Sequence, residues 1–215
     1  MAERKTVFIA GATGYMGRRL CAALLQRGHT VIALARPGSQ GKLPPECRVV
    51  LGNALDAGSY AAQVPPGCVF VHLVGVAHPS PAKARQFIEI DLASVRASLG
   101  AARHAAHFVY VSVAQPAPVM RAFIQARQAA EQLIAHSGLN ASILRPWYVL
   151  GPGHRWPLLL LPVYWLCERL PATAQTARRL GLVTLAQMRN ALTHAVEQAA
   201  PGQRVYDVEQ IRNLS

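Results

Sequence analysis

Three glycines stand at a fixed spacing near the start of the chain, where residues 11–17 are Gly-Ala-Thr-Gly-Tyr-Met-Gly. An apolar run at residues 6–10 precedes them, and leucines at helical spacing follow. In a strand–turn–helix unit the first glycine permits a sharp turn, the second lets backbone approach a pyrophosphate, and the third lets helix and strand pack closely. Phosphates are favoured there because unpaired N–H groups and the helix dipole both present positive charge. The pattern therefore predicts a dinucleotide phosphate site at Gly11, Gly14 and Gly17.

A positive side chain, Arg36, follows the next apolar run at residues 30–35. About 20 residues after such a turn, sites that select NAD carry Asp or Glu, which accepts a hydrogen bond from the ribose 2′-hydroxyl. A guanidinium pairs instead with a 2′-phosphate. Arg36 therefore predicts a preference for NADP(H), although an arginine at this place also accommodates NAD(H).

Apolar runs alternate with stretches of helical periodicity along the chain. Helices are expected after the glycine turn and over residues 82–105, 119–136 and 184–198, with a short last strand at 204–208. The alternation predicts an α/β doubly wound parallel sheet, an NAD(P)-binding Rossmann fold with a small C-terminal helical extension. The strands, nearly continuous in apolar residues as buried parallel strands are, are expected at residues 6–10, 30–35, 48–51, 68–74, 108–112 and 140–144.

A single domain is expected over residues 1–215, because no composition break, repeat or Gly/Ser linker divides the chain. Residues 154–215 are expected to extend it on the substrate side. Within them, Trp156–Cys167 is strongly apolar but too short, and too interrupted by proline, to span a bilayer. Two roles stay open for this segment: a lid or core helix over the substrate pocket, or a surface that docks on a membrane or a protein partner.

Charge and cysteine usage argue against several classes of protein. The net charge is +12, but the basic residues are scattered without a tail or an aromatic-interleaved stripe, so a small-molecule ligand is expected rather than nucleic acid. The four cysteines lack metal or redox spacing, and the close pair His104 and His107 has no Cys or carboxylate cluster beside it, so no metal site is predicted. The charged start of the chain does not resemble a secretion signal, and the cysteines suit a reducing compartment. Both features predict a cytoplasmic protein.

Polar or glycine residues follow several of the predicted strands. Ligands of open parallel sheets bind outside the carboxyl ends of the strands. We therefore expect one crevice to collect Arg36, Asn53, Gly75, Ser112 and Arg145.

Short motifs occur together between residues 6 and 153: the glycine turn, Arg36, Gly52-Asn53-Ala54-Leu55-Asp56, His72-Leu73-Val74-Gly75, Tyr110-Val111-Ser112, Ile143-Leu144-Arg145-Pro146 and Gly151-Pro152-Gly153. In these motifs the chain resembles the atypical or extended short-chain dehydrogenases/reductases, a superfamily that includes nucleoside-diphosphate-sugar epimerases and NmrA-like sensors. The resemblance implies cofactor contacts beside the glycine turn from Thr13, Tyr15 and Met16, and adenine contacts from Asn53, Ala54 and Leu55. On the nicotinamide side it implies contacts from Leu73, Val74, Gly75 and Ser112.

The chain departs from this superfamily at its proton relay. Members that transfer hydride use Tyr-x-x-x-Lys on one helix face, where the Tyr relays a proton and the Lys lowers its pKa and holds the cofactor ribose. The corresponding residues here are Phe123 and Arg127, and Asp91 replaces a structural Asn on the preceding long helix. Phe123 has no proton to give. Arg127 either contacts the ribose or forms an i,i+4 ion pair with Glu131.

The missing Tyr-x-x-x-Lys pair leaves two functions open. The first is an NADP(H)-binding protein with a cofactor-sensing, regulatory or scaffold role. The alternative is an oxidoreductase or epimerase-like enzyme that acts on a small molecule of quinone, flavin or sugar-nucleotide type with a non-standard proton donor. Ser112 and Tyr148 are the candidate catalytic residues, and His78 is a further candidate at the crevice. Hydride transfer to a quinone or flavin needs mainly positioning, because such an acceptor takes its proton from solvent.

Overall fold

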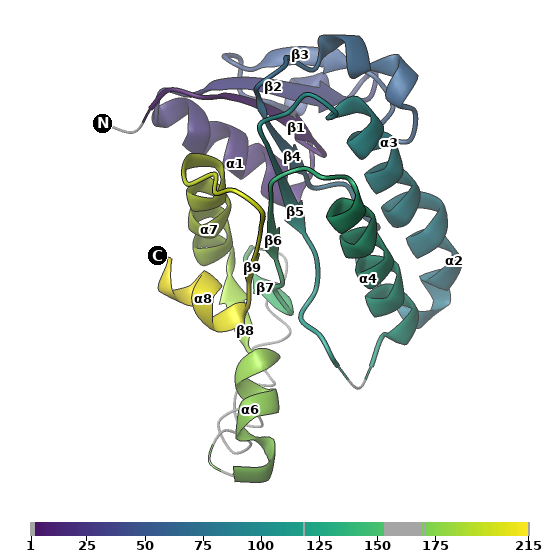
Figure 1. Ribbon diagram of the computed structural model, residues 1–215, viewed down its shortest axis with the longest axis vertical. Coiled ribbons are helices and arrows are strands. Elements are labelled where there is room, and N and C mark those ends of the chain that lie inside the picture. The colour runs from purple at the N-terminus through teal and green to yellow at the C-terminus, as the bar shows by residue number, and fades with distance from the viewer. Residues whose placement is uncertain (1–2, 118, 153–168, 170, 215) are drawn as a thin grey trace.

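The computed structural model describes residues 3–117, 119–152, 169 and 171–214. Its centre is a seven-stranded parallel sheet in the order β3-β2-β1-β4-β5-β6-β9 (Figure 1). The strands are β1 (Thr6–Ala10), β2 (Thr30–Ala35), β3 (Arg48–Leu51), β4 (Val69–His72), β5 (His107–Val111), β6 (Ala141–Leu144) and β9 (Gln203–Tyr206). The predicted doubly wound α/β fold is confirmed.

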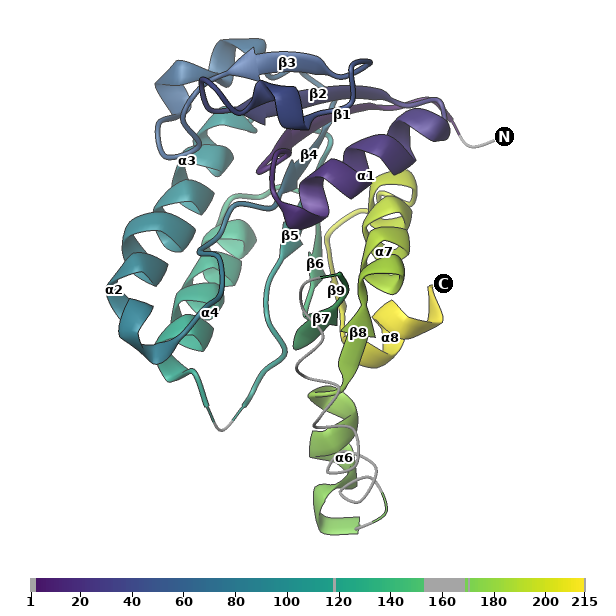
Figure 2. The same cartoon turned by 180° about the vertical axis from the view of Figure 1, so that it is seen from behind.

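Helices cover both faces of this sheet, as Figures 1 and 2 show. One face carries α1 (Tyr15–Gln26) and α7 (Leu185–Glu197), with α8 (Val208–Asn213) beside them. The other face carries α2 (Ala84–Gln86), the π-helical segment η5 (Phe87–Leu92), α3 (Ala93–Ala101) and α4 (Arg121–His136). Short 3₁₀ turns complete the connections: η1 (Gln40–Lys42), η2 (Ala57–Ser59), η3 (Ala61–Gln63) and η4 (Pro81–Lys83).

The register of the central strands aligns their carboxyl ends. Ala10 of β1 lies opposite His72 of β4, and His72 lies opposite Tyr110 of β5. The residues that follow these strands therefore emerge at one edge of the sheet, which is where a doubly wound fold binds its ligands.

Two apolar cores hold the helices to the sheet. On the α3 and α4 side, Phe8, Phe70 and Phe108 stack across neighbouring strands with ring centroids 5.2 and 5.4 Å apart. On the other side, residues of α1 and α7 such as Leu24 and Leu192 pack on the sheet and are fully or almost fully buried. The sheet is thus a rigid platform for the loops at its edge.

The C-terminal part of the described chain joins this platform. The predicted strand at 204–208 is confirmed as β9, at the edge of the main sheet, and the predicted helix at 184–198 as α7. The sequence did not predict α8, nor a separate two-stranded ladder of β7 (Tyr148–Leu150) with β8 (Leu182–Thr184). It also did not predict α6 (Pro171–Arg179), which extends past β8 (Figure 1).

One helix prediction needs correction. The helix expected over residues 82–105 contains the π-helical segment η5 and ends at Ala101. The residues after Asp56 form a pair of 3₁₀ turns, the first capped by the Asp56 carboxylate. The apolar segment Trp156–Cys167 lies outside the described residues. Among the described helices, none is long and apolar enough to cross a membrane.

Candidate functional site

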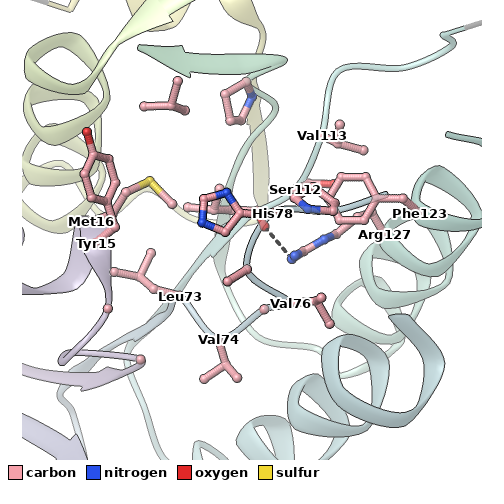
Figure 3. Close-up of a pocket in the computed structure, with 18 of the residues that line it drawn as sticks. Tyr15, Met16, Leu73, Val74, Val76, His78, Ser112, Val113, Phe123 and Arg127 are labelled. Carbon is pink, nitrogen blue, oxygen red and sulfur yellow. Dashed lines mark hydrogen bonds between the residues drawn. The ribbon is translucent and has the colours of Figure 1, made fainter. Parts of the chain in front are cut away.

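A cavity of about 720 Å³ opens at the carboxyl edge of β1, β4 and β5. Figure 3 shows Tyr15 and Met16 on one side of it and Ser112, Phe123 and Arg127 on the other. Eleven of the predicted site residues line this cavity: Gly11, Gly14, Tyr15, Met16, Gly17, Leu73, Val74, Gly75, Ser112, Arg127 and Tyr148.

The glycine turn leaves no room for side chains at two of its positions. Gly11 has a φ of +85°, and a Cβ added there would lie 2.7 Å from the carbonyl carbon of Leu73. A Cβ added to Gly17 would lie 2.3 Å from the Gly11 carbonyl oxygen. Helix α1 then begins at Tyr15, with no acidic residue in its first turn. This close, uncharged turn before a helix N-terminus fits the requirements of a pyrophosphate cradle.

The glycine turn also meets the second glycine motif of the chain. A Cβ added to Gly151 would lie 2.0 Å from the Tyr15 hydroxyl oxygen and 3.2 Å from the Leu185 side chain. Gly151 follows β7 directly, so the end of β7 lies beside Tyr15 at the glycine turn.

Arg127 forms part of that far wall, and its partners differ from the expected one. Its Nη2 donates to Asp91 Oδ2 at 2.9 Å, and its Nη1 donates to the Tyr110 hydroxyl at 3.1 Å and the Val111 carbonyl at 3.0 Å. Of the two alternatives for Arg127, the i,i+4 ion pair with Glu131 is therefore wrong, and the ribose contact stays a prediction. Burial raises the pKa of the Asp91 carboxyl, while the charge of Arg127 opposes that rise.

Arg127 still contributes to the cavity, because its guanidinium borders it. The residue is only 8% exposed, and its Nε is buried without a hydrogen-bond partner among the described residues. The ring of Phe123 lies against the guanidinium, with Cζ 5.0 Å from the ring centroid, and packs edge-on against Phe87. The wall thus combines a fixed cation with an aromatic face.

Ser112 borders the cavity and contacts a carboxylate behind it. Its Oγ donates to Glu131 Oε1 at 2.5 Å. Glu131 also accepts from Gln115 Nε2 at 3.0 Å, from Arg145 Nε at 3.0 Å and from Arg145 Nη2. The contact between Ser112 and Glu131 joins the loop after β5 to α4, and residues 19 apart in the chain offer no spacing signal that predicts it.

The five strand-end residues expected in one crevice do not all meet there. Gly75 and Ser112 line the cavity. Arg145 instead pairs with Glu131 and lines a second cavity of about 490 Å³. Arg36 is exposed directly after β2, and Asn53 is exposed after β3, further along the same edge of the sheet.

The residues expected around the adenine lie outside the main cavity. Asn53 Oδ1 accepts from the Leu55 N–H at 3.1 Å, and the Asn53 N–H donates to Ser59 Oγ at 3.0 Å, so the Asn53 loop is ordered by its own contacts. Thr13, Arg36, Asn53, Ala54 and Leu55 are all absent from the lining of the main cavity.

Both further candidate proton donors border the cavity. Tyr148 lies at the start of β7 against the ring of Trp147, with centroids 5.5 Å apart. His78 has a φ of +50°, and Lys83 Nζ donates to its carbonyl at 3.0 Å. Sequence reasoning did not find the neighbouring lining residues Met120 and Trp147, because both lie in irregular loops without a periodic signal.

The described part of the chain holds no group of three or more His, Cys, Asp or Glu residues that could bind a metal ion. His107 is buried in β5 and lies 2.9 Å from Ser142 Oγ. Burial lowers its pKa to about 4, so its imidazole is neutral.

Comparison with known proteins gives one family match and several relatives. A family model described as NAD(P)H-binding matches residues 11–153. Ceramide reductase of Caulobacter vibrioides is 33% identical over 81% of this chain and 56% of its own length. The chloroplastic divinyl chlorophyllide a 8-vinyl-reductase of Oryza sativa subsp. indica is 36% identical over 50% of this chain and 29% of its own. A 3-diazoavenalumate denitrifying reductase of a Streptomyces species is 30% identical over 68% of this chain and 57% of its own length.

In all three cases the chain covers less than two thirds of the relative's length. Among solved structures, the Bordetella bronchiseptica enzyme WbmH in complex with NAD⁺ has a TM-score of 0.70 at 19% identity, over 95% of this chain and 76% of the other. A UDP-galactose 4-epimerase also has a TM-score of 0.70, at 15% identity over 94% of this chain and 77% of the other. At these identities the likeness concerns the fold alone.

Proposed function

This chain belongs to the NAD(P)H-binding family of atypical short-chain dehydrogenases/reductases, and from that premise we propose that it is an oxidoreductase that transfers hydride between NADP(H) and a small, largely apolar molecule. The observation that carries the proposal is the cavity of about 720 Å³ that runs from the glycine turn to the wall of Ser112, Phe123 and Arg127. A volume of this size suits a nicotinamide together with a small substrate. When bound, the cofactor supplies or accepts the hydride.

The chain's own residues would hold that cofactor in three places. The backbone of the glycine turn, with Thr13, Tyr15 and Met16, holds the pyrophosphate against the start of α1. Leu73, Val74 and Gly75 border the nicotinamide side, and Ser112 and Arg127 close it. The cradle at Gly11 and Gly17 supports this assignment, because any side chain there would collide with backbone.

The adenine end of the cofactor is assigned to the neighbouring strand ends. Asn53, Ala54 and Leu55 follow β3, and Arg36 follows β2, next to the strand that precedes the glycine turn. The exposed guanidinium of Arg36 is suited to a 2′-phosphate, which supports NADP(H) over NAD(H).

The relatives support a redox role for the cavity. All three curated relatives named above are reductases by name, although each name concerns that protein's own substrate. Phe123 lines the cavity and, by the resemblance to hydride-transferring family members, stands for their tyrosine, so we assign proton transfer to other groups. Candidate substrates are therefore acceptors of quinone or flavin type, which take their proton from solvent and would lie against the rings of Phe123 and Trp147.

The proposal is tested with the purified protein. NADPH and NADH are first titrated by nicotinamide fluorescence, and NADPH oxidation is then followed with quinones, flavins and aryl ketones, and NADP⁺ reduction with the matching alcohols. We expect saturable NADPH binding and turnover with at least one acceptor or alcohol. Cofactor binding without hydride transfer to or from any of them contradicts an oxidoreductase.

A second function, cofactor sensing, is favoured by one specific observation. Arg127 is held by Asp91 and Tyr110, and Phe123 lies on it, so the wall can bind a nucleotide without supplying a proton. A sensor would bind NADPH, show no turnover, and change its resistance to limited proteolysis on binding. Turnover in the assay above excludes a purely sensing role.

A further inference from the structure

The thiols of Cys21 and Cys47 meet in the apolar core on the α1 side of the sheet. Cys21 lies in the middle of α1, and Cys47 directly precedes β3, 26 positions further along the chain. Cys21 is fully buried, whereas Cys47 is 7% exposed, and both belong to the same core. The Cys21 thiol donates a hydrogen bond to the Cys47 sulfur. The fold thus brings together two thiols that sequence spacing did not pair.

The two thiols differ in reactivity. The hydrogen bond from Cys21 lowers the pKa of the Cys47 thiol, while burial opposes that effect. The same hydrogen bond, together with burial, raises the pKa of Cys21. The thiolate is the form that reacts with oxidants, and Cys47 is also the thiol with exposed surface. An oxidant therefore reacts first with Cys47, and the Cys21 thiol lies beside the product.

Cys68 differs from this pair in place and in reactivity. It directly precedes β4 and belongs to the core on the α3 and α4 side, so the sheet separates it from Cys21 and Cys47. Burial raises the pKa of its thiol to about 11. Cys68 is therefore an internal control for the reactivity of the pair. The fourth cysteine, Cys167, lies outside the described residues.

The pair links two parts of the chain that we assign to the cofactor. Cys21 lies one helical turn beyond Gly17, the third glycine of the turn where α1 begins. Cys47 ends the connection that starts at Arg36 after β2. This connection consists of short turns, the last of which bonds the Cys47 N–H to the Pro44 carbonyl at 3.1 Å. A covalent bond holds two sulfurs closer than a hydrogen bond does, so it would move α1 and this connection relative to each other.

We propose that Cys21 and Cys47 form a reversible disulfide site through which hydrogen peroxide weakens binding of the dinucleotide cofactor. The inference goes beyond the proposed function, because it needs the cofactor site but no hydride transfer. The Cys47 sulfur attacks one oxygen of the peroxide, the O–O bond breaks, and a sulfenic acid and one water form. The Cys21 sulfur then displaces the sulfenic oxygen as a second water, and the S–S bond forms. Two thiols are oxidised and one peroxide is reduced; dithiothreitol reverses the change by two thiol–disulfide exchanges.

The disulfide is tested by peptide mapping of the wild-type protein, which does not depend on the folding of any variant. After peroxide treatment of the folded protein, the remaining thiols are alkylated in denaturant and the chain is digested with trypsin. We expect residues 20–27 joined to residues 43–48, because each segment is bounded by Arg or Lys. Dithiothreitol should separate them, and Cys68→Ser should give the same joined peptide. Absence of the joined peptide, or Cys21 joined to Cys68 instead, overturns the proposal.

The order of reaction is tested with two single variants. Cys21→Ser leaves the sulfenic acid of Cys47 without its partner thiol, so dimedone should label Cys47 after peroxide treatment. Cys47→Ser should leave Cys21 unlabelled, because Cys21 is fully buried. Labelling of Cys21 rather than Cys47 overturns the assignment of Cys47 as the reactive thiol.

The effect on the cofactor is tested by fluorescence titration with NADPH after the peroxide is removed. Oxidised wild-type protein should bind NADPH at least threefold more weakly than reduced protein, and dithiothreitol should restore the affinity. Cys47→Ala, treated in the same way, should keep the affinity of its untreated form. Equal affinities of oxidised and reduced wild-type protein overturn the switch. Lack of turnover with every acceptor and alcohol, by contrast, rejects the oxidoreductase function and leaves the disulfide site standing.

Discussion

Arg127 of α4 and Asp91 of η5 form a buried ion pair, with 2.9 Å between Nη2 and Oδ2, at the wall of the main cavity. The other carboxylate oxygen accepts from the Val76 N–H at 2.7 Å. A Cβ added to Gly75 would lie 2.7 Å from Arg127 Nη2. The pair therefore holds both α4 and the loop after β4, so it shapes the cavity from two sides.

Removal of one partner of this pair should be strongly destabilising. Arg127→Met leaves the Asp91 carboxylate buried without its cation, and we expect a loss of about 3–5 kcal/mol in the free energy of unfolding. The double variant Arg127→Met/Asp91→Leu should recover part of this loss, since no unpaired charge remains. Urea unfolding at pH 7 measures both, with exposed Arg121→Met as the control, expected within about 0.5 kcal/mol of wild type. A loss below about 1 kcal/mol for Arg127→Met would show that the pair contributes little.

The glycine turn should tolerate no side chain at its third position. A Cβ at Gly17 would lie 2.3 Å from the Gly11 carbonyl oxygen, so Gly17→Ala must displace backbone. We expect NADPH affinity to fall by at least about tenfold, together with a lower thermal midpoint. Gly41→Ala is the matched control, because nothing lies within 4 Å of its added Cβ. Equal NADPH affinities in both variants would contradict a phosphate site at this turn.

Arg36 should decide the choice between the two nicotinamide cofactors. Charged hydrogen bonds contribute about 1.5–3 kcal/mol, so Arg36→Ala should weaken NADPH binding by roughly 10- to 100-fold and leave NADH binding nearly unchanged. Arg48→Ala is the control, since Arg48 is exposed at the opposite end of the neighbouring strand β3. Fluorescence titration of both cofactors measures the effect. Wild-type protein that binds NADPH and NADH equally would reject the phosphate contact.

Two buried histidines should make stability depend on pH. Burial lowers the pKa of His72 to about 3 and that of His107 to about 4, below the ordinary value of 6.5. As pH falls, both histidines take up a proton in the unfolded chain before they do so in the folded protein. The stability that their neutral, buried state confers is therefore present above pH 6.5 and is lost as pH falls toward 4 and 3. Between pH 7 and pH 5 each of the two histidines should lower the free energy of unfolding by about 2 kcal/mol.

Urea unfolding at pH 7 and pH 5 measures this loss. His107→Gln should reduce the difference between the two pH values by about 2 kcal/mol, because glutamine does not titrate. His136→Gln, an exposed residue at the end of α4, is the control and should keep the wild-type difference. An unchanged difference in His107→Gln would contradict a neutral, buried imidazole.

Much of the fold follows from local patterns. Nearly continuous apolar runs predicted the six strands from β1 to β6, because strands buried on both faces leave no polar alternation. The strands β7 and β8 escaped prediction, since each has only three residues and lies outside the main sheet. The π-helical geometry of η5 escaped it as well, because apolar spacing marks a helix without showing whether its N–H groups bond four or five residues back.

The sequence by itself determined the glycine turn, the strands of the main sheet with the helices between them, and the residues that follow each of these strands, because these depend on neighbours within a few positions. Only the tertiary structure decided which of these residues act together. Arg127 lies four positions from Glu131 on α4, yet it pairs with Asp91, 36 positions away, while Glu131 pairs with Arg145 and Ser112. The physical reason is burial: a charge withdrawn from water takes the partner that packing places against it, and packing is a property of the whole fold.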